Sequence, residues 1–412
     1  MSRFFIFLGI VYLIGAFYGF QAFRTLIKNP WLQGAYILIF LLVLGNIYFQ
    51  FTGYERSQGM SSAMSLSVGV FLAFMTLGFV SGSVMLIEDV IRFFGWVLKK
   101  IVNAGSGTGM HFPERRKFVS QVALVLASIP FASLLYGMYK GKYNYRVLRY
   151  VLEFDDLPEA FNGYRITQIS DIHSGSFDDA AKVKYAVNLV NEQQSDVILF
   201  TGDMVNNVAS EMHPWKEVFS ALQAKDGVFS VLGNHDYGDY AEWDTEDDKA
   251  ANLEDLKRIQ REMGFDLLLN ESRYLERDGQ KIALVGVENW GAGGFKKAGD
   301  LDHALSGVAA DDFKVLMSHD PSHWESQVIN HPWHVHLTLS GHTHGMQFGV
   351  EIPGWIKWSP VKYRYKYWAG IYKELGQYIN VNRGFGYIGY PGRVGIWPEI
   401  SVIELRKKRE TV

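Results

Sequence analysis

Hydrophobic residues are unevenly distributed along this chain, and their pattern divides it into two unlike parts. In roughly the first 140 residues, four long apolar runs follow one another, separated by short polar or basic segments. Each run reaches the length of about 20 residues that an α-helix needs to cross a bilayer. Buried core helices are the alternative, but four such runs in succession exceed what a soluble core uses. We therefore predict transmembrane helices near residues 4–23, 31–51, 63–87 and 118–139.

Lysine and arginine residues gather beside some of these runs, and this bias indicates the orientation of the chain. The segment between the third and fourth runs is the most basic, so we expect it to be cytoplasmic and the large C-terminal part to be extracytoplasmic. Its basic residues are Arg92, Lys99, Lys100, Arg115, Arg116 and Lys117. Basic residues in 140–149 oppose this orientation, so the margin is small. The chain is thus expected to be a multi-pass protein of the cytoplasmic membrane.

Two parts of this basic segment suggest more specific roles. The pair Arg115-Arg116 stands just before an apolar run and resembles a twin-arginine export signal, which would carry the following domain outward already folded and metal-loaded. Ordinary basic anchoring beside the membrane is the alternative. Residues 90–102 mix apolar and basic positions at helical spacing, so we expect this segment to lie on the inner membrane surface.

From Tyr164 onward, short apolar runs of strand length alternate with helical stretches, which is typical of an α/β sheet. We predict strands near residues 165–169, 197–200, 228–232, 281–287, 314–317 and 334–339, and helices near 180–192 and 250–263. The predicted organisation is a transmembrane region at 1–140, a linker at 141–163, a catalytic domain at 164–406 and a tail at 407–412.

Charge and cysteine content narrow the kinds of function. The net charge of −3 shows no basic excess of the kind that nucleic-acid binding requires, so no nucleic-acid partner is expected. The chain has no cysteine, which excludes disulfides and zinc–thiolate sites. Any metal ion must therefore be held by histidine, aspartate, asparagine or glutamate side chains.

Polar side chains of these types follow the predicted strands, usually beside a glycine. Open α/β sheets bind ligands outside the carboxyl ends of their strands, so residues far apart in sequence should meet at one edge. The converging set is Asp171, His173, Asp203, Asn234, His235, His319, His342 and His344. Carboxylate, imidazole and amide ligands suit zinc, manganese or iron. The histidines at 213, 303, 323, 331, 334 and 336 lie outside this pattern.

Five motifs occur in order: D-x-H at 171–173, G-D-x-x-N at 202–206, G-N-H-D at 233–236, a lone His319, and G-H-x-H at 341–344. Together they resemble the calcineurin-like metallophosphoesterase superfamily over about residues 165–405, most closely a bacterial branch of membrane-bound or twin-arginine-exported phosphohydrolases. The resemblance implies an α/β/β/α sandwich of two mixed sheets, here preceded by an all-α transmembrane region of about four helices. Met346 stands where the family usually has glycine, which could alter access beside the site.

The resemblance also implies roles for the site residues. One divalent metal ion would be held by Asp171, His173, Asp203 and His344, and a second by Asp203, Asn234, His319 and His342. Two such ions clamp the attacking and leaving oxygens and generate a bridging hydroxide from water. His235 would face the phosphate, where it could protonate the leaving oxygen or stabilise developing negative charge. Apart from the resemblance, Asp236 stands next to His235 and is expected to orient its ring, and Asn206 is expected to fix the loop that carries Asp203 through backbone hydrogen bonds.

The leading hypothesis is hydrolysis of a phosphomonoester or phosphodiester outside the cytoplasmic membrane, on a substrate that can be lipid-linked, with membrane lipid as a partner. A cytoplasm-facing pyrophosphatase acting on a nucleotide-linked lipid, such as UDP-2,3-diacylglucosamine, is the alternative. A membrane sensor that keeps the metal fold without turnover is a third hypothesis, although such degenerate members should have lost ligands or His235.

Three further segments admit two interpretations each. The aromatic and basic residues of 355–372 suit a lid or membrane-facing surface, or an edge strand and loop over the site. Arg383 and Arg393 could bind phosphate or pair with acids. The acidic run at 239–248 suits a solvated loop or a metal-regulating element.

Overall fold

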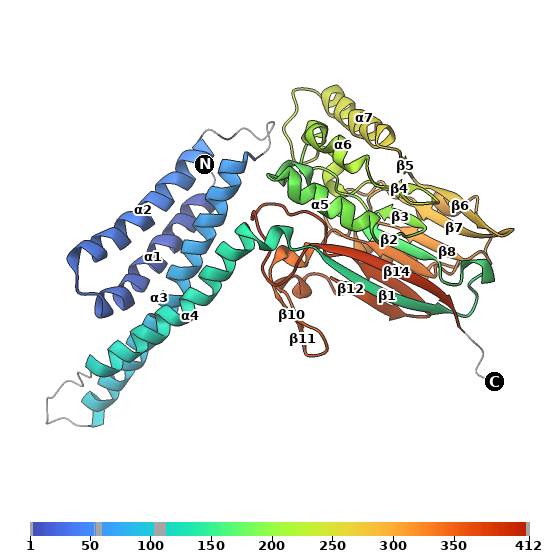
Figure 1. Cartoon of the computed structure of the whole chain (residues 1–412). Coiled ribbons are helices and arrows are strands. Elements are labelled where there is room, and N and C mark those ends of the chain that lie inside the picture. The colour runs from blue at the N-terminus through green and yellow to red at the C-terminus, as the bar shows by residue number, and fades with distance from the viewer. Residues whose placement is uncertain (1–2, 53, 55–59, 103–112, 409–412) are drawn as a thin grey trace. The chain divides into compact units, whose positions relative to one another are not determined.

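The computed structural model describes residues 3–52, 54, 60–102 and 113–408. It divides into two compact units (Figure 1), one formed by Met1–Tyr54 and Ala63–Tyr139 and the other by Glu55–Ser62 and Lys140–Val412. Most of the short tail predicted at 407–412 lies outside the described residues.

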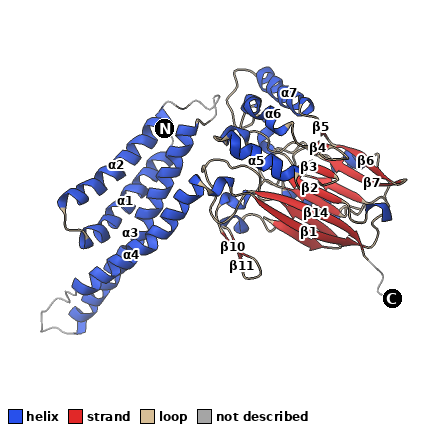
Figure 2. Ribbon diagram, in the orientation of Figure 1, coloured by secondary structure: helices blue, strands red, loops and turns tan. Residues whose placement is uncertain are grey.

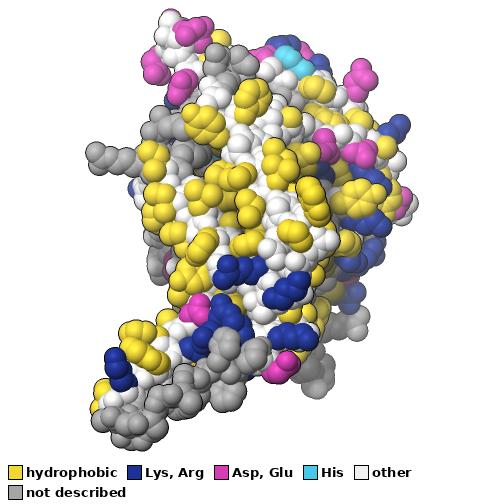
Figure 3. Space-filling view, turned by 90° about the vertical axis from the view of Figure 1, so that its left-hand side faces the viewer, with side chains coloured by type: hydrophobic (Ala, Val, Ile, Leu, Met, Phe, Trp, Pro, Cys, Tyr) yellow, Lys and Arg dark blue, Asp and Glu magenta, His cyan; other side chains and the backbone are white. Residues whose placement is uncertain are grey.

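The helical unit contains four long helices, all of them apolar and long enough to cross a membrane. They are α1 (Arg3–Leu26), α2 (Pro30–Thr52), α3 (Ser62–Val102) and α4 (Pro113–Tyr139). Many of their large apolar side chains point outward, and hydrophobic side chains dominate the face shown in Figure 3. An apolar exterior of this extent suits lipid rather than water. The four predicted membrane helices are therefore confirmed.

The third helix is longer than the membrane span predicted at 63–87. Residues 90–102 are not a helix of their own, because α3 continues through them as a single 41-residue helix. Their expected position on the inner membrane surface stays a prediction. No proline interrupts this stretch, and Glu88 and Arg92 are spaced to pair along the helix. Arg116 of α4 binds Glu88 at 2.8 Å and Asp89 at 2.6 Å. The second arginine of the expected export signal therefore has carboxylate partners on α3.

The second unit is built on two six-stranded mixed sheets (Figure 2). The first has the order β1 (Arg146–Phe154), β14 (Glu399–Lys407), β2 (Arg165–Ile169), β3 (Val197–Phe200), β4 (Val228–Ser230) and β5 (Phe265–Leu267). The second has the order β12 (Gly370–Glu374), β13 (Gln377–Val381), β9 (Leu337–Ser340), β8 (Lys314–Met317), β7 (Gln280–Gly286) and β6 (Glu271–Arg277). Strands β2 to β5 run parallel to one another, as do β7, β8, β9 and β13.

The alternation of side chains along each strand explains the layers. Val197 and Leu199 of β3 join the apolar core that both sheets share. Ile198 and Phe200 point to the other face, against the helices α5 (Ala180–Asn191) and α7 (Glu246–Glu262). The second sheet is covered on its outer face by α8 (Leu301–Leu305) and α9 (Pro321–Ser326). Both faces of each sheet are thus buried, as near-continuous apolar strands require, and the predicted α/β/β/α sandwich is confirmed.

The stretch expected to be a linker, residues 141–163, belongs to this unit instead. It contains β1, which pairs in parallel with β14 over nine residues, from Arg146 opposite Glu399 to Phe154 opposite Lys407. Leu152 and Phe154 enter the core between the sheets. The basic residues of β1 point outward along a sheet edge, where charged side chains are well tolerated. The sequence suggested a membrane-flanking linker because the pairing partner of β1, strand β14, is far away in sequence.

Candidate metal centre

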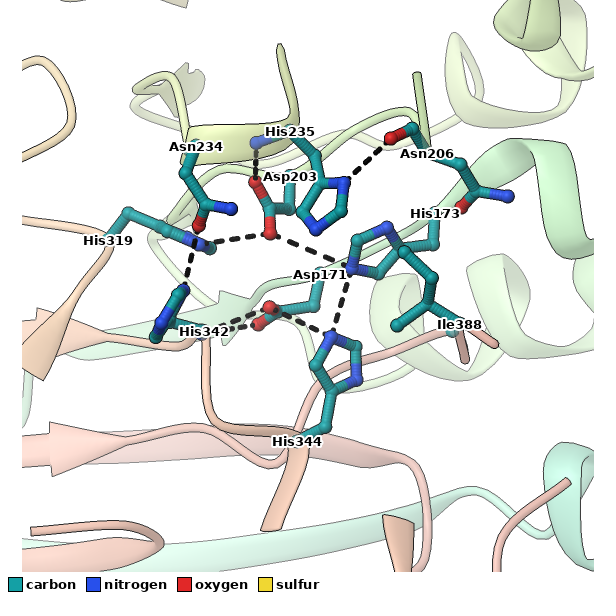
Figure 4. Close-up of polar contacts among 12 residues, drawn as sticks. Asp171, His173, Asp203, Asn206, Asn234, His235, His319, His342, His344 and Ile388 are labelled. Carbon is teal, nitrogen blue, oxygen red and sulfur yellow. Dashed lines mark hydrogen bonds and ion pairs between the residues drawn. The ribbon is translucent and has the colours of Figure 1, made fainter. Parts of the chain in front are cut away.

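The candidate ligands come from five parallel strands whose carboxyl ends meet at one edge of the sandwich. In the first sheet, β2 leads to Asp171 and His173, β3 to Asp203, and β4 to Asn234 and His235. In the second sheet, β8 leads to His319, and β9 leads to His342 and His344. Figure 4 shows these side chains converging on one small region. The convergence expected from the sequence is therefore what the fold produces.

One group of ligand atoms is formed by Asp171, His173 and His344, which are all buried. The two imidazole Nε2 atoms lie 2.9 Å apart, and Nε2 of His344 lies 3.2 Å from Oδ1 of Asp171. Asp171 is held in place by accepting the backbone N–H of His342, at 2.9 and 3.1 Å from its two oxygens. Two ring nitrogens and a carboxylate that point at one another form a natural cradle for a cation.

A second group is formed by Asp203, His319 and His342, with Asn234 beside it. Oδ2 of Asp203 lies 3.1 Å from Nε2 of His319, and 3.6 Å from Nε2 of His173 in the first group. Nδ1 of His342 lies 2.8 Å from Oδ1 of Asn234. Asp203 thus stands between the two groups, and its other oxygen accepts the backbone N–H of His235 at 2.8 Å.

The backbone at the site is unusual. Five of the seven candidate ligands, which are Asp171, His173, Asp203, His342 and His344, have positive φ angles between 48° and 68°. Non-glycine residues rarely adopt this left-handed conformation, which costs of order 1–3 kcal/mol each and persists where the surroundings impose it. The turns after these strands therefore aim side chains at the edge of the sheets at a cost in backbone strain.

The charges of the two groups fit divalent metal ions. Burial raises the pKa of Asp203, but the neighbouring His319 and His235 outweigh it, so the carboxylate is ionised. Burial lowers the pKa of His173 and of His342, which keeps both rings neutral and able to coordinate. Burial acts in the same direction on His319, but the Asp203 carboxylate raises its pKa to about 10. Nε2 of His319 is buried and faces Oδ2 of Asp203 at 3.1 Å, so a cation between these two residues would replace a proton.

The structure contradicts the expected role of Asp236. Its buried carboxylate does not contact the ring of His235, but accepts backbone N–H groups at 2.8 to 3.3 Å. The donors are Asp203, Met204, Val205 and Gly233. Burial and the nearby Asp203 raise the pKa of Asp236 to about 7, against the effect of these donors. Asp236 therefore ties the loop after β3 to the loop after β4.

The ring of His235 is oriented by a backbone group instead. Its Nδ1 lies 2.6 Å from the carbonyl oxygen of Asn206, and Figure 4 shows the second ring nitrogen pointing toward the space between Asp203 and His173. The side chain of Asn206 binds Ser176, so it does not fix the Asp203 loop in the way that the motif suggested. The carbonyl acts as an acceptor that keeps a proton on Nδ1 and directs Nε2 into the site.

Several site residues could not be found from the motifs. The Tyr365 hydroxyl lies 2.8 Å from Nε2 of His342, and the buried Asp320 carboxylate lies 3.4 Å from the same atom. Tyr240 belongs to none of the motifs. Its hydroxyl nevertheless accepts a hydrogen bond from Asn234 at 2.9 Å, and its ring centre lies 4.4 Å from that of His235. Such outer contacts orient metal ligands and tune their basicity. The sequence offered one signal for these contacts, because Tyr365 lies in the aromatic segment 355–372 and Tyr240 in the acidic run 239–248.

The acidic run and the two arginines can now be assigned. The end of the 239–248 run forms the first turn of α7, where acidic side chains complement the helix dipole. Arg383 pairs with Glu351 at 2.6 Å and with Glu399 at 2.5 Å, which is the acid-pairing interpretation. Arg393 donates from Nε to the carbonyl of Gly386 at 2.8 Å and is fully buried.

Comparisons with known proteins agree with this geometry. A model described as "Probable Calcineurin-like phosphoesterase, transmembrane domain" matches residues 2–142, and a model described as "Calcineurin-like phosphoesterase" matches residues 164–346. YkuE of Bacillus subtilis, an uncharacterized metallophosphoesterase, is 28% identical over 66% of this chain and 89% of its own length.

Two further relatives carry similar names. A transmembrane protein with a metallophosphoesterase domain from Danio rerio is 28% identical over 69% of this chain, but this match spans only 62% of the relative. The phosphodiesterase YaeI of Escherichia coli is 26% identical over 71% of this chain and 99% of its own length. The chain therefore belongs to the calcineurin-like metallophosphoesterases, a family of phosphoester hydrolases, and carries a four-helix transmembrane domain before its catalytic domain.

Proposed function

We propose that this chain hydrolyses a phosphate ester with two divalent metal ions bound at the candidate centre. The single observation that carries this proposal is the position of Asp203, whose Oδ2 atom faces His319 of one ligand group and His173 of the other. A carboxylate shared by two groups of ligands suits a pair of ions and offsets their mutual repulsion.

The proposed ligands divide between two ions. Asp171, His173, Asp203 and His344 hold one ion, and Asp203, Asn234, His319 and His342 hold the other. Such a pair, when bound, lowers the pKa of water and clamps the attacking and leaving oxygens of an in-line displacement. Manganese, zinc and iron all accept this set of imidazole, carboxylate and amide ligands.

His235 is the proposed acid. The carbonyl of Asn206 accepts from Nδ1, so a protonated ring has its second N–H, on Nε2, free to donate to a phosphate oxygen or to the leaving oxygen. The ring of Tyr240 packs against His235 and limits its rotation.

The proposed location of the site is extracytoplasmic, and the proposed substrate is a phosphate ester presented at the membrane. Two of the basic residues that oppose this orientation have partners within the second unit, which we call the catalytic unit. Lys142 pairs with Asp178, and Arg149 with Gln193. The Arg115-Arg116 export signal stays a prediction. Fusion of alkaline phosphatase to the C-terminus tests the orientation, because active phosphatase requires an extracytoplasmic end.

The reaction is tested with the purified full-length chain in detergent. Hydrolysis of bis(p-nitrophenyl) phosphate and p-nitrophenyl phosphate is measured with Mn²⁺ and with a chelator. We expect metal-dependent turnover that falls about 10²–10⁴-fold in His235→Ala, the range for loss of a general acid. His303→Ala is the matched control, because His303 is exposed on α8 outside the site. Absence of turnover toward either ester while two ions are bound per chain would contradict the proposal.

A further inference from the structure

A small hairpin of the catalytic unit exposes an apolar face. Strands β10 (Val350–Ile352) and β11 (Ile356–Trp358) pair only with each other and project from the unit in Figure 2. The side chains of Val350, Ile352 and Ile356 are exposed, and Trp355 in the connecting turn is 77% exposed. Apolar side chains gathered on a projecting hairpin are unfavourable in water and mark a contact surface.

This surface continues back to the metal centre. Met346 and Phe348 are also exposed, so alternate residues from 346 to 352 present apolar side chains to the surroundings. The series starts two residues after the candidate ligand His344. We call these residues, together with Trp355 and Ile356, the apolar stripe.

The base of the hairpin packs, within its own unit, beside the segment that follows the last membrane helix in sequence. α4 ends at Tyr139, and Gly141 already belongs to the catalytic unit. Gly141 packs against the carbonyl of Arg393, so closely that any side chain there would clash. The next residue, Val394, pairs with the hairpin base: its N–H binds the carbonyl of Gln347 at 2.8 Å, and its carbonyl accepts from Gly349 at 2.9 Å. The base of the hairpin is therefore linked, through Arg393 and Val394, to a residue only two positions after the end of α4 in sequence.

The charges around the stripe suit an anionic surface. Lys362 and Arg364 are exposed after the hairpin and have no carboxylate partner among the described residues of the chain. Their neighbours Tyr363 and Tyr365 are aromatic, and Lys362 and Arg364 lie over those rings at 5.3 and 5.5 Å. The one acidic residue of the hairpin, Glu351, is neutralised by Arg383. Tryptophan, tyrosine and lysine or arginine are the residues that favour the lipid headgroup region.

We propose that the apolar stripe is a docking surface for a lipid bilayer, in which the β10–β11 hairpin enters the headgroup region with Trp355 leading. The tether at Gly141, the apolar face and the unpaired cations all favour lipid over a second copy or another protein. Taken with the proposed function, on which this second step rests, the stripe favours amphiphilic phosphate esters that stay in the bilayer as substrates.

The absence of cysteine allows a direct test in the full chain, because a single introduced cysteine can be labelled. A fluorophore on Trp355→Cys is compared with one on Leu375→Cys, which is 72% exposed in the turn between β12 and β13. Both proteins are placed in vesicles of phosphatidylcholine and phosphatidylglycerol that contain a lipid-attached nitroxide quencher. We expect loss of fluorescence at position 355 and none at 375.

Two changes probe the cause of that loss. Ile352→Ser with Ile356→Ser in the Trp355→Cys background should weaken quenching at 355, since it removes apolar side chains that are already exposed. Vesicles without phosphatidylglycerol should also weaken it, because the cations lose their partners. Equal quenching at 355 and 375, or none at 355, would overturn the proposal. A change in the fluorescence spectrum at position 355 that grows with the amount of protein in the vesicles, but not with the amount of quencher, would also overturn the proposal. None of these readouts needs catalysis, so a failure of the docking proposal can be told apart from a failure of the proposed hydrolysis.

Discussion

Replacing Asp236 with asparagine should loosen the two loops that carry Asp203 and Asn234. The Oδ1 atom of Asp236 accepts backbone N–H groups from Met204 and Val205, and its Oδ2 atom accepts from Asp203 and Gly233. Asparagine keeps one oxygen but replaces the other with an NH₂ group, which can only donate. In either orientation of the amide, two of these buried N–H groups therefore lose their acceptor.

The size of the effect follows from that count. A buried donor without a partner costs about 1–3 kcal/mol, so two of them cost about 2–6 kcal/mol. For a domain of this size, each kcal/mol lowers the unfolding midpoint by about 2–4 °C, which predicts a fall of at least about 4 °C. Because Asp203 faces both groups of ligands, we also expect weaker metal binding.

The assay compares Asp236→Asn with Asp239→Asn in the full-length chain. Asp239 is a nearby exposed carboxylate that pairs with Lys249, and surface pairs of this kind contribute about 0–1 kcal/mol. Thermal unfolding and calorimetric titration with Mn²⁺ are measured for both variants. Normal unfolding and normal metal affinity combined with slow turnover would refute this reasoning, and would instead return Asp236 to a role in orienting His235.

Three further outcomes are expected. Tyr365→Phe removes the hydroxyl that lies 2.8 Å from Nε2 of His342, and should weaken binding of one metal ion by about 10–100-fold in a calorimetric titration. Arg383→Gln leaves the fully buried Glu399 without its cation, and should destabilise the catalytic unit by about 3–5 kcal/mol in thermal unfolding. Chelation should lower the unfolding midpoint of the wild-type chain, since ions at 100 times their dissociation constant contribute about 2.7 kcal/mol.

Matched variants separate these effects from general damage. Tyr363→Phe removes a neighbouring hydroxyl from a ring that is 78% exposed, so metal affinity should not change. Arg406→Gln breaks the exposed pair with Glu404, so the midpoint should barely move. If either control matched its partner variant, or if chelation also shifted the midpoint of an Asp203→Ala chain, the structural explanation would be wrong.

The sequence predicted the general fold because its strongest signals are local. The strands at 165–169, 197–200 and 314–317 have the predicted limits, since each is a short apolar run followed by a turn. The edge strand β1 was missed because a half-exposed strand lacks that continuous apolar pattern. The buried strands β13 and β14 were not predicted either, and β12 begins in the segment 355–372, for which an edge strand was one interpretation. The position of β1 depends on its partner β14, far away in sequence.

For the site, too, the sequence predicted which residues take part but not which groups hold them in place. The eight converging residues could be named because parallel strands bring their carboxyl ends to one edge, which the order of the elements already implies. The family resemblance then implied which seven of them hold metal ions. The partners of Asp236 and His235 could not be named, because backbone N–H and carbonyl groups carry no sequence signature. Here Asp236 binds the backbone of Asp203 and its neighbours, while the carbonyl of Asn206 holds His235.

By itself, the sequence determined four membrane helices, an α/β domain and the set of side chains able to hold metal ions, because periodicity and residue chemistry are properties of the chain. The sandwich of two sheets was implied by the resemblance to a known family. Only the tertiary structure decided which groups orient those side chains. The left-handed turns after the strands, the contact of Tyr365 with His342, and the hairpin base at Val394 all join segments that are distant in sequence. Such contacts follow from close packing of the whole domain rather than from any local pattern.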